Sequence, residues 1–190
     1  PASVVQITDI FDTDRLDPRR FRLGTYAFGD TVIRARENSP HDQQETSLPN
    51  GMKLVLRASL DPATGTATWQ FITIDPETGR PPVNPLYGFL PPNTPEADGD
   101  GEGYVTFTIV PRPFGPDTPD PPVVRNAATI VFDNQEAMVT NTTETRLVES
   151  VYQSAVSDFS GDPDDGLDTF DGDVLTVSWN LAPESADLDP

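Results

Sequence analysis

The sequence has no cysteine, a single histidine and no long apolar run, and each of these absences excludes a class of protein. Without cysteine, the chain can form neither a disulfide framework nor a thiolate metal site. Without a second imidazole, His41 cannot complete a histidine metal site, and we expect it to be a solvated residue. No stretch approaches the roughly 20 apolar residues of a membrane-spanning helix, so we expect no membrane insertion.

Basic residues are also scarce. The chain has 31 acidic residues against 12 basic ones, and its formal net charge is −19. Such a charge repels nucleic acids and anionic membranes, so we expect neither as a partner. It attracts divalent cations, and it is typical of a surface that is exposed to salt or to the extracellular medium. We therefore expect an extracellular or cell-surface location.

Chain-breaking residues, in contrast, are abundant. The 21 prolines and 13 glycines recur every few residues and leave no room for a long helix. Between them lie short runs in which apolar and polar residues alternate, which is the period of a β-strand. We predict an all-β fold, namely an immunoglobulin-like antiparallel β-sandwich of about seven to nine strands with an extra C-terminal strand segment.

Two pairs of runs give the clearest strands. Residues 52–60 and 66–74 flank a turn at residues 61–65 and predict a hairpin. Residues 104–110 and 127–132 predict two core strands that pair within one antiparallel sheet.

The remaining segments give weaker signals. We expect one strand at residues 4–11, two short strands on either side of Gly24, a polar loop at residues 37–50 and a closing strand at residues 138–148. The proline-rich residues 81–94 are expected to form a loop that covers one open end of the sandwich.

The composition of the sequence changes at about residue 151. Residues 1–150 are expected to form the β-sandwich module, and residues 151–190 an acidic linker followed by a strand at residues 174–181. This strand either completes the sandwich, or starts or docks on a neighbouring module. It could also pair with a second chain by strand exchange, which would make the protein a polymer subunit.

Four motifs follow one another in the first 150 residues: GFLPPN at 88–93, GEGYVTFTI at 101–109, RNAA at 125–128 and IVFD at 130–133. With them the chain resembles the β-sandwich module of very large secreted or cell-surface bacterial proteins, over roughly residues 4–148. The usual pattern is lost after Asp133, where residues 134–137 replace a proline-containing segment. The resemblance implies a structural or adhesive role among other domains and no defined set of catalytic residues.

Two acidic segments carry candidate ligands for calcium, which prefers six to eight oxygen atoms. In residues 96–102, glycines let alternate carboxylates converge, and residues 162–173 are dense in aspartate. The alternatives are a solvated acidic turn and a flexible acidic linker, respectively. The expected calcium ligands are Asp98, Asp100, Glu102, Asp162, Asp164, Asp168, Asp171 and Asp173.

The sequence contains no nucleophilic cysteine, no histidine beside a serine motif and no phosphate-binding loop, so we expect no enzyme. We expect a non-catalytic structural or adhesive module, stabilised by calcium, that assembles end to end or by strand exchange into a filament or layer. Its expected partners are neighbouring modules of the same polypeptide or other copies of itself. The alternative is a carbohydrate-binding module in which Trp69, Tyr87 and Phe89 stack on a glycan. A solvent-facing row of these rings would favour the glycan, and buried rings the structural role.

Overall fold

The computed structural model describes residues 1–36, 39–93, 99–114 and 122–147, and the backbone of residues 154–155, 169–170 and 174–180. Apart from one 3-10 turn, η1 (Pro85–Tyr87), all of the regular structure in this part of the chain is β, and its strands pair antiparallel. The all-β antiparallel prediction is therefore confirmed. In these residues, no helix is long and apolar enough to cross a membrane.

The larger sheet has six strands in the order β10-β9-β1-β6-β5-β4. Its strands are β1 (Val4–Ile10), β4 (His41–Ser47), β5 (Lys53–Asp61), β6 (Thr66–Ile74), β9 (Ala128–Phe132) and β10 (Met138–Val139). The N-terminal strand β1 lies inside this sheet, hydrogen-bonded to β6 on one side and to β9 on the other. The predicted hairpin is confirmed, because β5 and β6 pair directly across the turn that ends at Gly65.

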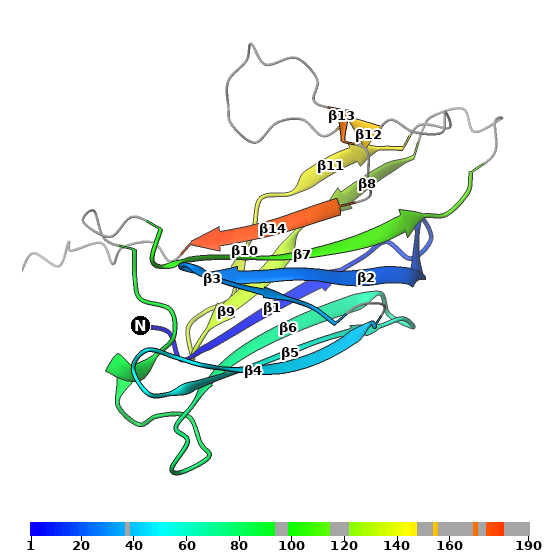
Figure 1. Cartoon of the computed structure of the whole chain (residues 1–190). Coiled ribbons are helices and arrows are strands. Elements are labelled where there is room, and N and C mark those ends of the chain that lie inside the picture. Colours follow the sequence, from blue (N-terminus) through cyan, green and yellow to red (C-terminus); the bar gives the residue numbers. More distant parts are fainter. Residues whose placement is uncertain are drawn as a thin grey trace, which may run out of the picture.

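The smaller sheet has four strands in the order β14-β7-β2-β3. Its strands are β2 (Leu16–Phe28), β3 (Thr31–Arg34), β7 (Glu102–Pro111) and β14 (Val174–Asn180). Two short ribbons accompany the sheets: β8 (Val123–Asn126) pairs with β11 (Thr143–Arg146), and β12 (Ser154–Ala155) pairs with β13 (Thr169–Phe170). The two large sheets form two layers, one above the other (Figure 1).

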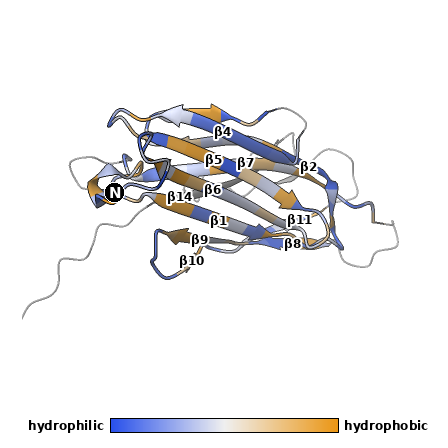
Figure 2. Cartoon of the chain, turned by 90° about the horizontal axis from the view of Figure 1, so that it is seen from below, coloured by the Kyte–Doolittle hydropathy of each residue, from blue (hydrophilic) through white to orange (hydrophobic). Residues whose placement is uncertain are grey.

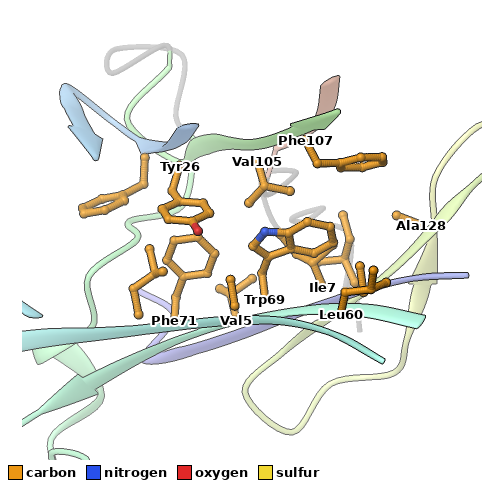
Figure 3. Packing of buried hydrophobic residues seen from close by; sticks show 14 of the residues in the cluster. Val5, Ile7, Tyr26, Leu60, Trp69, Phe71, Val105, Phe107 and Ala128 are labelled. Atoms are coloured by element: carbon orange, nitrogen blue, oxygen red, sulfur yellow. The ribbon is translucent and has the colours of Figure 1, made fainter. Parts of the chain in front are cut away.

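A single hydrophobic core fills the space between the two layers. Along β5 and β6 of the larger sheet, hydrophobic and hydrophilic residues alternate, so that one face of these strands is apolar (Figure 2). Trp69 and Phe71 rise from β6 toward Tyr26, Val105 and Phe107 of the smaller sheet (Figure 3). Each fully buried large side chain contributes on the order of 2 kcal/mol to stability, so this core replaces the disulfides that the chain lacks.

The prediction that residues 104–110 and 127–132 pair with each other is wrong. β7 pairs with β2 and β14 in the smaller sheet, whereas β9 pairs with β1 and β10 in the larger one. Both runs do bury one full face, but they bury it from opposite sides of the core. Alternation shows that a strand has a buried face and does not show which strand lies beside it.

Three other expectations about strands are also wrong. The predicted loop at residues 37–50 contains the edge strand β4, whose side chains are almost all polar. The short strands expected at residues 21–23 and 26–33 are not separated at Gly24: β2 continues through it to Phe28, with two irregularities in its pairing with β7, and residues 31–33 belong to β3. The single closing strand is instead β10 and β11, which belong to different sheets. As a result, the described residues among 1–147 form eleven strands rather than seven to nine.

Candidate functional site

The predicted site residues that the structure describes lie mostly at one end of the two sheets, which we call the Ala2 end. Here Ala2 donates its backbone N–H to the carbonyl of Leu90 over 2.6 Å. A few residues on, Gly101 donates its N–H to Oδ1 of Asn93 over 2.7 Å. Residues 85–93 and 99–103 are therefore fixed beside the start of β1, and Tyr87, Phe89, Asp100 and Glu102 with them.

The start of β1 is held by Asp133, which follows β9. Oδ1 of Asp133 accepts hydrogen bonds from the backbone N–H of Ser3, at 2.9 Å, and of Val4, at 2.8 Å. The N–H of Asp133 itself donates to the carbonyl of Val4 over 2.7 Å. Its φ of +47° lies in the left-handed region, which aspartate tolerates better than most residues. Asp133 thus sets the direction in which the chain enters the sheet.

Of the expected calcium ligands, Asp100 and Glu102 are described, and both are exposed to solvent. Nδ2 of Asn93 lies 3.4 Å from Oε1 of Glu102. Asp98, Asp162, Asp164, Asp168, Asp171 and Asp173 lie outside the described residues. Within the residues that are described, no three acidic or histidine side chains lie close enough to hold a metal ion. Calcium binding stays a prediction.

A shallow depression lies next to these carboxylates. It has a volume of about 180 Å³, and its walls include Phe28, Gly29, Glu102 and Tyr104. Pockets that hold small organic ligands usually measure about 300–1,000 Å³. The depression is therefore smaller than the usual pocket for a small organic ligand.

The three aromatic residues considered for glycan binding do not form a row. Trp69 is fully buried in the core, where its ring stacks on Phe107 with centroids 5.7 Å apart. Phe89 is buried against Phe28 and Phe71, at centroid distances of 5.3 and 5.8 Å. Only Tyr87, with 43% of its surface exposed, presents its ring to solvent.

The loop expected to cover the open end does so with only part of its apolar residues. Phe89 and Leu90 are buried and close the core at the Ala2 end. Val83 and Leu86 are exposed instead, beside Tyr87. The turn that carries them is fixed by Asn84, whose Oδ1 accepts the N–H of Leu86 over 3.0 Å.

Two carboxylates are buried, and both connect separate strands. Asp42 of β4 accepts hydrogen bonds at Oδ2 from the hydroxyl of Tyr26, at 3.3 Å, and from Nε2 of Gln44, at 2.7 Å. Because Tyr26 belongs to β2, this contact ties the larger sheet to the smaller one. Burial, and then the charge of Asp42, raise the pKa of Tyr26 above its ordinary value.

The second buried carboxylate is Asp9 of β1. Its Oδ2 accepts a hydrogen bond of 2.8 Å from Nδ2 of Asn126, the last residue of β8. Burial raises the pKa of Asp9 to about 6, and the bond from Asn126 opposes this shift. The contact fixes the point at which the chain leaves the β8–β11 ribbon and enters the larger sheet as β9.

Sequence reasoning missed a concentration of arginine on β2 and β3. Residues 18–36 contain five arginines and one acidic residue, Asp30, a local charge of +4 in a chain of net charge −19. The signal was present in the sequence, but the strongly acidic total charge hid it. A count of charge along the chain would have found it.

No family model, curated protein or solved structure matches this chain. Function is therefore inferred from its own residues. The features that matter are the filled core, the two buried carboxylates, the Ala2 end and the arginines of β2 and β3.

Proposed function

We propose that this chain is a non-catalytic structural or adhesive module of a large extracellular bacterial surface protein, with its two sheets in an immunoglobulin-like arrangement. The packing between the sheets is the observation that carries the proposal. Trp69, Phe21 and Phe107 pack with one another across the interior, with ring centroids 5.4–6.5 Å apart. A core filled in this way stabilises the body and leaves the outer surfaces for interactions with partners.

The buried polar groups also support a structural role. Asp42 joins the two sheets through Tyr26, and Asp9 joins β1 to Asn126. The carboxylate contacts another strand in both cases, over 16 positions in the sequence for Asp42 and 117 for Asp9. Such contacts specify how strands are arranged, which is the work of a scaffold.

The direction of the first and last described strands suits a module that projects from its polypeptide. β1 starts at the Ala2 end, and β14 finishes there, because Asn180 pairs with Glu102. Figure 1 shows the N-terminus and the arrowhead of β14 at the same end of the molecule. A body attached at this end leaves both outer sheet faces exposed to partners.

Carbohydrate binding is the alternative function. It rests on the exposed ring of Tyr87, with Val83 and Leu86 beside it. The burial of Trp69 and Phe89 favours the structural role, since neither ring can reach a sugar without opening the core.

Protease resistance and glycan binding together test the proposal. We expect the intact chain to withstand a broad-specificity protease at 37 °C for hours, with any cuts in the loops. Mass spectrometry would locate the cuts. Rapid digestion within β5, β6 or β7 would contradict a structural module. On a glycan array, binding that is lost in Tyr87→Ala and kept in Leu86→Ala would replace the proposal with the carbohydrate-binding function.

A further inference from the structure

The outer face of the smaller sheet carries a cluster of arginines, which we call the arginine face: Arg20, Arg22 and Arg34. Phe21 is buried in the core, so its neighbours Arg20 and Arg22 project to the solvent side of β2. Arg34 lies on the adjacent strand β3, where it pairs with Thr25. All three arginines are exposed.

These arginines are not neutralised by the described part of the chain. Nη1 of Arg22 donates to the backbone carbonyls of Arg19 and Phe21, at 3.2 and 2.7 Å. The ion pairs among the described residues involve Arg15, Arg36, Lys53 and Arg125, and none involves the arginine face. Guanidinium groups in such a cluster form strong, often bidentate hydrogen bonds with carboxylates.

The Ala2 end of the same molecule has the opposite charge. It carries carboxylates that follow β2 and β6, precede β7 or begin it, and all of them are at least partly exposed: Asp30, Asp75, Glu77, Asp100 and Glu102. The basic residues nearest to them in sequence are Arg80 and Arg34. At physiological salt, charges interact over about 8 Å, so each surface acts through its local charge rather than through the net charge of −19.

We propose that the arginine face docks on the acidic Ala2 end of a second copy of this chain. One surface is a sheet face and the other is the end of the body, and the two point in different directions on one molecule. When two copies bind in this way, one arginine face and one Ala2 end stay free on the pair. Further copies can therefore be added at both, and association continues into an open chain of copies. This inference rests on the proposed function, because it names the partner with which the module assembles.

The test is the mass of the intact chain measured by light scattering and sedimentation velocity over a range of concentrations. We expect the mean mass to rise with concentration at about 0.15 M salt, where the Debye length is about 8 Å, and to return to that of the monomer at about 1 M, where it is about 3 Å. Arg20→Glu, Arg22→Glu and Arg34→Glu combined should weaken association about a hundredfold or more at about 0.15 M salt. Arg57→Glu, on the outer face of the other sheet, should leave it unchanged.

A charge swap makes the test specific to the two surfaces. Asp30→Lys, Glu77→Lys and Glu102→Lys combined should also abolish association. An equimolar mixture of this variant with the triple arginine variant should restore it, because each acidic surface then meets a basic one. Circular dichroism would confirm that both variants are folded.

Three results would overturn the inference. The first is a chain that stays monomeric at about 0.15 M salt, and the second is association that persists in the triple arginine variant. The third is a triple arginine variant whose sedimentation coefficient differs from that of the parent chain by the same amount at every concentration. That result would show that the arginines bind the chain's own acidic residues 157–173. A monomeric chain that still resists protease would retain the proposed function and lose only this interface.

Discussion

The side-chain amide of Asn126 donates a hydrogen bond of 2.8 Å to Oδ2 of Asp9, while Oδ1 of the same carboxylate is buried without a hydrogen-bond partner. The two residues are 117 positions apart in the sequence. The residues opposite Asp9 on the neighbouring strands, Ala67 and Ala128, are apolar. The contact therefore orders the junction of three strands at the cost of burying a charge.

This burial predicts how stability depends on pH. The pKa of Asp9 is raised from an ordinary value of 3.8 to about 6, so between these values the folded chain holds a proton that the unfolded chain has lost. The contribution of Asp9 to the free energy of unfolding is therefore fully present below pH 3.8 and is lost as pH rises through 6. The shift corresponds to roughly 3 kcal/mol.

Asp9→Asn removes the titrating group. Relative to the parent chain, this variant should gain stability as the pH rises from 4 to 7, measured by urea unfolding at a series of pH values. Gln135→Ala, which replaces an exposed residue that does not titrate, is the control and should keep a constant difference from the parent. A constant difference for Asp9→Asn as well would refute the assignment.

The turn at Asp133 predicts a second effect on stability. Asp133→Ala removes the acceptor of two backbone N–H groups and places alanine at a positive φ, so it should cost about 2 kcal/mol. Asp133→Asn keeps an oxygen acceptor and tolerates this φ, and it should cost clearly less. Glu136→Ala in the same turn serves as the control. Equal losses of unfolding free energy for Asp133→Ala and Glu136→Ala, measured by urea unfolding, would show that other contacts hold the start of β1 in place.

The hydrogen bond between Tyr26 and Asp42 predicts how much stability each of three substitutions costs. Tyr26→Phe removes one hydrogen bond to a carboxylate that keeps Gln44, and it should cost about 1 kcal/mol. Asp42→Ala leaves the buried hydroxyl of Tyr26 without its acceptor, and it should cost about 2–3 kcal/mol. Arg36→Ala should have little effect, because its pair with Asp42 spans 3.7 Å and its side chain is 73% exposed. The reverse order, with Tyr26→Phe the more costly, would contradict this account.

Part of the fold could be predicted from the sequence because apolar and polar residues alternate along individual strands. In β6, every second residue from Ala67 to Thr73 is fully buried, as its sequence indicates. β4 could not be predicted, because an edge strand buries little and its sequence, HDQQETS, reads as a loop. The separation of β7 and β9 into different sheets depends on pairing between distant strands, about which a local pattern carries no information.

The site residues were less predictable than the strands, for a related reason. The bond between Asn126 and Asp9 depends on the folding of the whole chain. The left-handed turn at Asp133 is one of many positions at which aspartate could have formed a turn. Trp69 lies in an alternating run, where a ring is more often part of the core than a ligand-stacking group. Phe89 lies in a loop, and no local pattern in its sequence shows that its ring is buried.

Calcium is expected to stabilise the module through its acidic segments. We predict that millimolar calcium raises the melting temperature of the chain by several degrees over that in excess EDTA, because a bound ion stabilises the folded state that holds it. Magnesium at the same concentration should have a smaller effect, since it loses its water less readily. Identical melting curves in EDTA and calcium would leave the acidic segments as solvated surface.

The central claim is that both sheets and their shared core form one cooperative structural body, and differential scanning calorimetry of the intact chain tests it most directly. We predict a single transition of the folded body, with a calorimetric enthalpy equal to the van't Hoff enthalpy and close to 100 kcal/mol, as about 0.7 kcal/mol per residue implies for roughly 150 residues. Two resolved transitions, or a calorimetric enthalpy well above the van't Hoff value, would show that the sheets unfold separately and would contradict the account.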